Sequence, residues 1–420
     1  ESELSIGKEI QLTATILPKN TTDKTITWTS SNENVATITT SGLLKIIGYG
    51  EVTITAKTSN DKISEKSIDI HLIINEVASG YYHNLLIDGL GNLWSWGSNT
   101  KGSLGNGTET SSLKPIQIKK GTKFKNVSAG EEFSLAIDGS GNLWTWGYNN
   151  YGQLGNGKTV NSKAPIQIKN GIKFKAISAG DNHSLAIDMD GNLWTWGNNQ
   201  SGQLGNNTTN DSSIPIKIKN GTKFKQISAG YDYSLAIDES GNLWVWGSNK
   251  YGTLGDGTSI SRKIPTKIKS GTKFKIISAG YDYSLAIDED DNLWTWGNNE
   301  YGQLGNNTKT SSNVPIKITI EMKIKSISAG RNHTLAIDES GNLWTWGYNS
   351  KGQLGNGTKS ASLKPIQIEK NTKFKTVSAG QNYSLAIDES GNLWVWGDNG
   401  NGQLGNGTTT NSLVPTKIKF

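Results

Sequence analysis

The sequence predicts an all-β chain whose larger part is a closed seven-bladed β-propeller, preceded by a small β-sandwich. Three observations lead to this prediction: a fifty-residue repeat, a pair of tryptophans in each repeat, and 50 glycines among 420 residues. Self-similarity at a fixed period of this length is the signature of repeat architectures. Radial repetition of four-stranded sheets, the propeller, leaves only short and protected strand edges.

The period is clearest in the glycine that closes each Ser-Ala-Gly tripeptide (Ala-Ser-Gly in the first repeat). This glycine recurs every fifty residues without insertion, at Gly80, Gly130, Gly180, Gly230, Gly280, Gly330 and Gly380. Trp-x-Trp pairs follow in step from Trp94/Trp96 to Trp394/Trp396, and prolines do the same from Pro115 to Pro415. Seven intact units predict seven blades.

Each unit contains four strand-like runs, which residues 215–264 illustrate. The runs are PIKIK, KFKQISAG, YSLAID and NLWVWG, and short turns with Gly or Asn separate them. A long Gly-rich segment, residues 247–264, follows the fourth run. Because short links join antiparallel neighbours and long links cross between sheets, we expect a blade to run from a Pro strand to the next Trp-x-Trp-Gly.

The two ends of the repeat region predict how the ring closes. The first unit, roughly residues 72–97, has three strands because no Pro strand precedes it, and the chain finishes with Pro415–Phe420. We expect Pro415–Phe420 to pair with the strand of Val77 and complete the first blade. An open solenoid is disfavoured because its terminal repeats are atypical polar caps, whereas the last unit here is as regular as the others.

The repeat motifs resemble the regulator-of-chromosome-condensation repeat family. The carriers of the resemblance are SAGxxxSLAID, LWxWG and GxNxxGQLGNG, across residues 72–420. The resemblance implies a seven-bladed propeller, in agreement with the repeat count. It also implies the activities known in that family: its founding member is a guanine-nucleotide exchange factor for a small GTPase that also binds chromatin, and one bacterial propeller inhibits a β-lactamase.

The segment before the repeats resembles the group 2 bacterial Ig-like domain, through LSIGKEIQLTATILP and ITWTSSNENVATITTSGLLKIIGYGEVTITA. This implies an N-terminal Ig-like β-sandwich with Trp28 in its core and the family's usual first strand, upstream of Leu4, missing. Strands are expected at 10–16, 25–29, 52–57 and 66–72. The predicted domains are residues 1–72 and 73–420, with blade one closed by 415–420. The family implies an extracellular or bacterial cell-surface location.

Composition narrows the classes of function. The net charge of +6 is thinly spread, whereas a nucleic-acid binder gathers its Lys and Arg on one face, so no nucleic-acid partner is expected. The absence of Cys excludes disulfides, thiol catalysis and Cys-ligated metals. No apolar run approaches the ~18 residues of a membrane-spanning helix, so no membrane insertion is expected. We expect a monomer.

Residue types that could carry chemistry fit a scaffold instead. Tryptophans at i and i+2 point to the same side of a strand and are expected to pack between blades. The Asp of each SLAID is expected to accept backbone N–H bonds in the following turn. Three of the four His residues share one repeat column with Phe and Tyr, which indicates a packing position: His83, Phe133, His183, Tyr233, Tyr283, His333 and Tyr383. No catalytic residue, cofactor or metal site is predicted.

Candidate binding residues are the positions that vary among the repeats. In a four-stranded antiparallel blade, the loops after Ser-Ala-Gly and the long crossovers lie on one face. The first variable position holds Tyr81, Glu131, Asp181, Tyr231, Tyr281, Arg331 and Gln381, and the second holds Tyr82, Glu132, Asn182, Asp232, Asp282, Asn332 and Asn382. The crossovers add Tyr151, Tyr251 and Tyr301. Tyr and Arg are favoured interface anchors, so this face is predicted to bind a protein.

The sequence therefore favours a non-enzymatic interaction module of a bacterial secreted or cell-surface protein. Its expected partner is a protein, with a glycan as the less favoured ligand. Two alternatives come from the resemblance: an effector that acts on a small GTPase as an exchange factor, and a protein inhibitor of an enzyme such as a β-lactamase. Fold alone does not choose among these functions.

Overall fold

The computed structural model describes residues 7–17, 23–47, 50–58, 63–70, 74–168, 171–218, 221–268, 271–319 and 322–418. Within these ranges the regular structure is entirely β-strand, and no helix is long and apolar enough to cross a membrane. The chain divides into two compact units, one within residues 1–73 and one spanning residues 74–418.

The first unit contains two three-stranded antiparallel sheets, with strand orders β1-β4-β3 and β2-β5-β6. Their bounds are β1 (Glu9–Gln11), β2 (Ile26–Ser30), β3 (Ala36–Ile38), β4 (Leu43–Ile46), β5 (Gly50–Thr58) and β6 (Ile63–Ile70). Leu44 and Ile46 of one sheet share a hydrophobic core with Val52 and Ile54 of the other, and Trp28 packs against it. This contact is the one predicted for Trp28.

The expected strands of the first unit differ in extent from the observed ones. The strand predicted at 10–16 is only three residues long, and β3 and β4 were not anticipated. Residues 71–72, the end of the strand expected at 66–72, lie outside the described residues, as does the region of Leu4.

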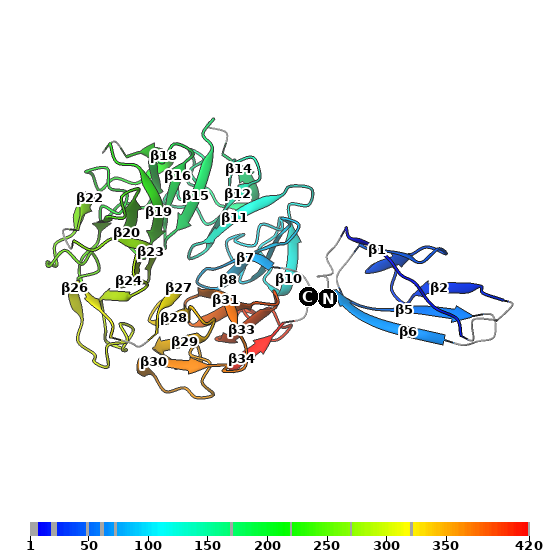
Figure 1. Ribbon diagram of the computed structural model, residues 1–420. Coiled ribbons are helices and arrows are strands. Elements are labelled where there is room, and N and C mark those ends of the chain that lie inside the picture. Colours follow the sequence, from blue (N-terminus) through cyan, green and yellow to red (C-terminus); the bar gives the residue numbers. More distant parts are fainter. Residues whose placement is uncertain are drawn as a thin grey trace. The chain divides into compact units, whose positions relative to one another are not determined.

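The second unit contains seven four-stranded sheets arranged around a common centre (Figure 1). The four strands of each sheet follow one another in sequence. The first strands are β7 (Ile74–Ser79), β11 (Phe124–Ala129), β15 (Phe174–Ala179), β19 (Phe224–Ala229), β23 (Phe274–Ala279), β27 (Ile324–Ala329) and β31 (Phe374–Ala379). The second strands are β8 (His83–Asp88), β12 (Phe133–Asp138), β16 (His183–Asp188), β20 (Tyr233–Asp238), β24 (Tyr283–Asp288), β28 (His333–Asp338) and β32 (Tyr383–Asp388).

The third strands carry the Trp-x-Trp pairs: β9 (Leu93–Gly97), β13 (Leu143–Gly147), β17 (Leu193–Gly197), β21 (Leu243–Gly247), β25 (Leu293–Gly297), β29 (Leu343–Gly347) and β33 (Leu393–Gly397). The fourth strands carry the repeat prolines: β10 (Ser112–Ile118), β14 (Ser162–Gln167), β18 (Ser212–Lys217), β22 (Arg262–Lys267), β26 (Ser312–Lys317), β30 (Ser362–Ile368) and β34 (Ser412–Lys417). Proline is tolerated there because the fourth strand is a sheet edge.

The observed blade frame differs from the predicted one. The Pro strand follows the long crossover and pairs with the Trp-x-Trp strand before it, as Val245↔Thr266 and Gly247↔Arg262 show. A blade therefore ends on a Pro strand instead of beginning with one, and the expected frame is wrong. The rule that long links cross between sheets fails here because the crossover folds back onto the edge of its own sheet.

The predicted pairing of Pro415–Phe420 with the strand of Val77 is also wrong. β34 pairs with β33, through Val395↔Thr416 and Trp394↔Lys417. The sheet that contains Val77 already has its own fourth strand, β10. The first repeat lacks a strand only in the incorrect frame. Residues 419–420 lie outside the described part of the chain.

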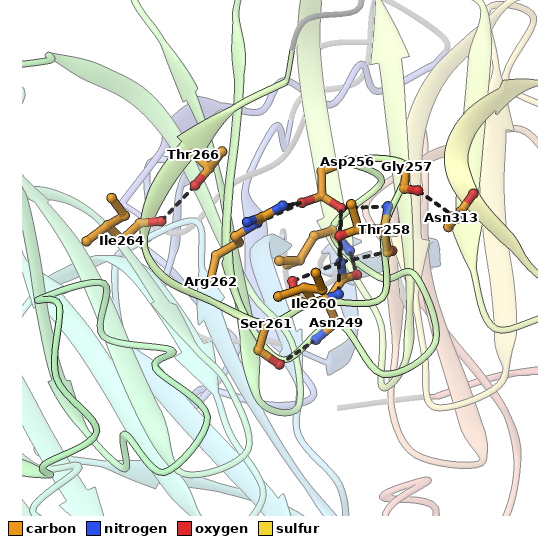
Figure 2. Close-up of polar contacts among 11 residues, drawn as sticks. Asn249, Asp256, Gly257, Thr258, Ile260, Ser261, Arg262, Ile264, Thr266 and Asn313 are labelled. Atoms are coloured by element: carbon orange, nitrogen blue, oxygen red, sulfur yellow. Dashed lines mark hydrogen bonds and ion pairs between the residues drawn. The ribbon is translucent and has the colours of Figure 1, made fainter.

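A buried asparagine organises each crossover, and Figure 2 shows the example of blade four. Asn249 Nδ2 donates to Asp256 Oδ1 at 3.0 Å, to Thr258 O at 3.1 Å and to Ile260 O at 3.3 Å. In this repeat Asp256 also forms an ion pair with Arg262, at 2.7 Å. The asparagine side chain thus donates to backbone carbonyl groups of the loop that have no partner in a sheet. These hydrogen bonds hold the long connection in a compact form.

The hydrophobic core lies between neighbouring sheets. The second Trp of each pair is fully buried, and Trp246 Nε1 donates to Gln203 O in the preceding crossover at 2.7 Å. The first Trp is half-buried, and Trp244 Nε1 donates to Asp238 Oδ2 at 2.9 Å. Leu235 and Ile237 of blade four pack against Trp296 of blade five. The predicted packing of tryptophans between blades is confirmed.

Hydrogen bonds also join the seventh sheet to the first. Trp96 Nε1 donates to Gln403 O at 2.9 Å, as Trp246 does to Gln203. Ser79 N donates to Ser378 Oγ at 2.9 Å. Equivalent backbone-to-serine bonds link the first strands of sequential blades, for example Ala229 N to Ser178 Oγ at 2.9 Å.

Candidate binding site

The seven Ser-Ala-Gly turns meet around a cavity of about 90 Å³. A glycine from each of the seven blades, with the alanine before it (Ser79 in blade one), forms much of its wall. A Cβ atom on Gly230 would lie 2.3 Å from Tyr233 Cε1 and 2.8 Å from Gly280 O. Glycine is therefore required at this position, because any side chain would collide with the wall of its own or the next blade.

Five predicted residues of the first variable position line the cavity: Tyr81, Asp181, Tyr231, Tyr281 and Arg331. The rings of Tyr231 and Tyr281 stack with their centroids 4.0 Å apart, and Arg331 Cζ lies 4.8 Å from the Tyr281 centroid. A guanidinium over an aromatic face at this distance is a favourable cation–π contact. Three blades thus contribute one continuous stack to one side of the cavity.

Asp181 is the carboxyl group of the cavity wall, and only 6% of the residue is exposed. Its Oδ2 accepts a hydrogen bond from Asn182 Nδ2 at 2.9 Å, whereas Oδ1 has no hydrogen-bond partner among the described residues. Burial, and then repulsion from Glu131, raises the pKa of Asp181 to about 8. Burial, the charge of Asp181 and a hydrogen bond between the two side chains raise the pKa of Tyr81 well above its usual value.

Residues of the second variable position hold the crossovers against the turns. The crossover glutamine of the preceding blade donates to this position, from Gln153 to Asn182 Oδ1 at 3.0 Å and from Gln203 to Asp232 Oδ1 at 3.1 Å. Ser248 N, at the start of the next crossover, donates to Asp232 O at 2.8 Å. Turns and crossovers therefore lie at the same end of the sheets. The crossover glutamines were not singled out in the sequence, although their recurrence in QLG was a usable signal.

The crossover tyrosines do not line the cavity. Tyr151 packs edge-on against Tyr148 at 6.3 Å, and Tyr301 packs against Tyr348 at 4.7 Å. Tyr251 is 39% exposed and has Lys250 Nζ 5.2 Å above its ring. The predicted residues Glu131 and Gln381 likewise occupy the first variable position but are not part of the cavity wall.

The histidine column is a packing position, as predicted. His83 Nε2 lies 2.9 Å from Ser134 Oγ of the next blade, and Tyr283 fills the same place in blade five. Burial lowers the pKa of His83 to about 4 and the pKa values of His183 and His333 to about 3. In the part of the chain that the structure describes, no three potential metal ligands come together.

The repeated aspartates cap turns, which confirms their predicted role. Asp238 Oδ1 accepts from the backbone N of Ser240 at 3.0 Å and of Asn242 at 2.9 Å. Its Oδ2 accepts from Trp244 Nε1. These carboxylates lie at the ends of the second strands, at the opposite end of the sheets from the cavity.

Families of known proteins match both units. The RCC1-like domain matches residues 172–420. The regulator of chromosome condensation (RCC1) repeat matches in two forms, the first at residues 91–137 and 140–187 and the second at residues 74–103 and 124–153. The bacterial Ig-like domain (group 2) matches residues 1–68.

Solved propellers of this type share the fold. The structure of Prp20p from Saccharomyces cerevisiae, described with its binding properties to Gsp1p and histones, is 24% identical with a TM-score of 0.72, over 83% of this chain and 88% of that one. Yeast RCC1 (Prp20) bound to Kap60 is 23% identical with a TM-score of 0.71, over 83% and 86%. Human WBSCR16 is 22% identical with a TM-score of 0.72, over 78% and 94%.

Curated relatives share only short stretches. A 3-O-alpha-D-galactosyl-alpha-L-arabinofuranosidase of Bifidobacterium longum is 37% identical over 70 residues, which are 17% of this chain and 6% of the enzyme. The kappa-carrageenase of Pseudoalteromonas carrageenovora is 39% identical over 66 residues, which are 16% of this chain and 17% of the enzyme.

Proposed function

Because this chain belongs to the family of RCC1-like domains, we propose that it is a non-enzymatic protein-interaction module. Its binding face is formed by the Ser-Ala-Gly turns and the crossovers. One observation carries the proposal: the two positions after each Ser-Ala-Gly vary among otherwise near-identical repeats, and five residues of the first position line one cavity. Residues that do not vary are used in packing between blades or in capping turns.

The chemistry of this face supports a protein ligand. It combines aromatic rings, carboxyl groups and one arginine, and such mixtures characterise interface anchors. The cavity of about 90 Å³ is small beside the ~300–1,000 Å³ of pockets that enclose a drug-sized ligand. A glycan is therefore less well accommodated than a protein surface that places one side chain in the cavity.

The proposal includes a closed ring of seven blades that acts as a monomer. Closure is supported by the bonds from Trp96 to Gln403 and from Ser79 to Ser378, which repeat the contacts between sequential blades. A closed ring keeps the seven turns at fixed distances, and a rigid surface loses less entropy on binding. We expect sedimentation velocity to show a single species with the mass of the monomer.

We place this module outside the cell or on a bacterial cell surface. The match to the bacterial Ig-like domain at residues 1–68 supports this location, as do the short similarities to bacterial polysaccharide-degrading enzymes. Protease treatment of intact producing cells should release or degrade the chain. Complete protection in intact cells, with degradation after lysis, would contradict the location.

The binding face is tested by affinity capture, with two sets of substitutions at opposite ends of the sheets. One variant carries Tyr231→Ala, Tyr281→Ala and Arg331→Ala, and the control carries Asp190→Ala and Glu239→Ala in exposed turns. Proteins captured by the wild type are identified, and their affinities are measured for all three forms. We expect at least ten-fold weaker binding for the first variant only. Loss confined to the control variant would move the binding site to the other end.

An exchange factor for a small GTPase is the second candidate, because the fold is shared with Prp20p. It is tested by the release of labelled GDP from a panel of small GTPases, and catalytic acceleration would replace the leading proposal. Inhibition of a β-lactamase is tested in the same series by hydrolysis of a chromogenic β-lactam.

A further inference from the structure

The axial cavity contains a carboxyl group that the surrounding residues leave incompletely paired. Asp181 lines the cavity with 6% of its surface exposed, and its Oδ1 has no hydrogen-bond partner among the described residues. None of the ion pairs between described residues involves Asp181. Buried carboxyl groups are normally paired, and an exception in a cavity is expected where a ligand supplies the missing partner.

The surroundings of Asp181 favour a cation as that partner. Glu131 and Asp232 both act on it as like charges, and the half-buried Asp282 lies in the next turn of the ring. Arg331 and Lys250, two of the cations at this end, are placed over the rings of Tyr281 and Tyr251. Arg331 also attracts Glu131 and Asp282, but its charge is not among those that act most strongly on Asp181. A positive group in the cavity would therefore relieve repulsion among several carboxyl groups at once.

The other walls of the cavity suit a cation as well. Tyr81, Tyr231 and Tyr281 line it, and the charge of Asp181 raises the pKa of all three hydroxyls. Aromatic faces attract ammonium and guanidinium groups, and the contact of Arg331 with Tyr281 is an example within the same cavity. A carboxyl group flanked by tyrosines therefore forms a site for an organic cation.

Size restricts the ligand further. About 90 Å³ accommodates the end of one side chain and not a whole small molecule of drug size. An ammonium group is a compact point charge with three donors, whereas a guanidinium is broad and planar. The compact group matches a small cavity in which a single oxygen, Oδ1 of Asp181, awaits a donor.

We infer that the axial cavity binds the ammonium group of a lysine side chain presented by a partner protein. Asp181 is its counter-ion. Burial and repulsion from Glu131 raise the pKa of Asp181 to about 8, so below that pH the ammonium group displaces the proton of Asp181 as it binds. The rings of Tyr81 and Tyr231 form the wall around the methylene groups of the lysine. The inference deepens the proposed function and rests on it, because the lysine is delivered by a protein. It adds the chemical identity of the residue that anchors the partner at the axis.

The test uses Nα-acetyl-lysine methylamide as the probe and NMR titration of the whole chain. The arginine and norleucine analogues are the comparison ligands, at constant ionic strength. We expect saturable binding of the lysine probe, and at least ten-fold weaker binding for the other two. Equal binding of the norleucine analogue would overturn the role of charge, and equal binding of the arginine analogue would overturn the choice of lysine.

Two variants in the same blade locate the site. Asp181→Asn replaces the titratable carboxyl group of the cavity by a neutral amide, and Asp190→Asn makes the same change in an exposed turn at the opposite end of the sheets. We expect Asp181→Asn to weaken binding of the lysine probe by ten-fold or more, and Asp190→Asn to leave it unchanged. Thermal unfolding of both variants establishes that they fold. Undiminished binding by folded Asp181→Asn would overturn the inference.

The inference and the proposed function fail in distinguishable ways. A captured partner that is lost with the Tyr231, Tyr281 and Arg331 substitutions, yet is unaffected by Asp181→Asn, would uphold the protein-binding face and refute the lysine anchor. Saturable, Asp181-dependent binding of the lysine probe by a chain that captures no protein would uphold the ammonium site and refute the protein-binding function.

Discussion

The hydroxyl of Tyr383 connects the seventh blade to the first, and its removal tests whether the ring is closed. It lies 2.9 Å from His83 O, 3.0 Å from Gly80 O and 3.0 Å from Asn84 Oδ1. Tyr383→Phe deletes the hydroxyl without a steric change, because Phe133 already fills the same column in blade two. Only contacts across this one junction are lost.

The expected magnitude follows from the contacts. One buried hydroxyl bond contributes about 1 kcal/mol, and leaving Asn84 Oδ1 without this donor adds about 1 kcal/mol. At ~2.1 cal/mol/K per residue, the 345 residues from 74 to 418 have an unfolding entropy of about 0.7 kcal/mol/K. A loss of ~2 kcal/mol should therefore lower Tm by roughly 3 °C if the ring unfolds as one unit.

The assay is differential scanning calorimetry with Tyr283→Phe as the matched control. Tyr283 OH bonds to His333 O and Thr334 Oγ1 across an ordinary junction between sequential blades. We expect the two variants to lower Tm by similar amounts. If Tyr283→Phe lowers Tm and Tyr383→Phe does not, the first and seventh blades are not joined in solution and the closed ring is refuted.

Three further predictions follow from the cavity and the core. Gly230→Ala should lower the free energy of unfolding, measured in urea, by about 1–3 kcal/mol because the new Cβ meets Tyr233. Gly221→Ala, at φ 70° in open space, should lower it by about 1 kcal/mol. Equal losses would contradict the crowding at Gly230. Asp181 has a folded pKa of about 8, above the ~4 of an unfolded Asp, so it stabilises fully below pH ~4 and this stability is lost towards pH ~8. In the wild type the free energy of unfolding should fall between pH ~4 and ~8, and Asp181→Asn should make this slope shallower by at most ~1.4 kcal/mol per pH unit. An unchanged slope would show that the pKa of Asp181 is not raised. Trp246→Phe should lower the free energy of unfolding by about 2–3 kcal/mol, because it removes a buried hydrogen bond and leaves a cavity. Trp244→Phe should lower it by less, because Trp244 is only half-buried. Chemical denaturation measures both, and the reverse order would contradict their burial.

The all-β class, the repeat unit and the packing of the tryptophans were predictable because they are recorded in periodicity. Trp-x-Trp at i and i+2 places both indoles on one side of a strand, and the structure has them between blades. The turn role of Asp238 was also accessible, because an Asp before a Gly-containing turn has few other uses.

The blade frame was not predictable from link lengths. In a perfectly periodic chain, every cyclic choice of four consecutive strands gives the same sequence pattern, so only the pairing decides where a blade begins. The decisive interaction is the side chain of Asn249, which stabilises the crossover so that it returns to its own sheet. A recurring Asn two residues after each Trp-x-Trp-Gly was visible, but its bonding partners were not.

The candidate site was predictable as a face but not as a cavity. Variation among repeats identified the first variable position, yet it could not separate Asp181, which lines the cavity, from Glu131, which does not. That difference arises from the closeness of seven turns around one centre and from which side chains point inward. Alternation along a strand does not extend into such turns, so sequence reasoning had no rule to apply.

Asn84 is one of the residues that distinguish the first repeat from the other six, which carry Ser or Thr at the same position. Its Nδ2 donates to Gln403 O at 2.8 Å, and its Oδ1 lies 3.0 Å from Tyr383 OH. Near-identical repeats are interchangeable during folding, and such chains are prone to misassembly and exchange of units between molecules. The amide of Asn84 occurs only at the junction between the seventh and first blades, so this junction differs from the six junctions between sequential blades. Asn84 therefore favours pairing of the seventh blade with the first over pairing with any other blade.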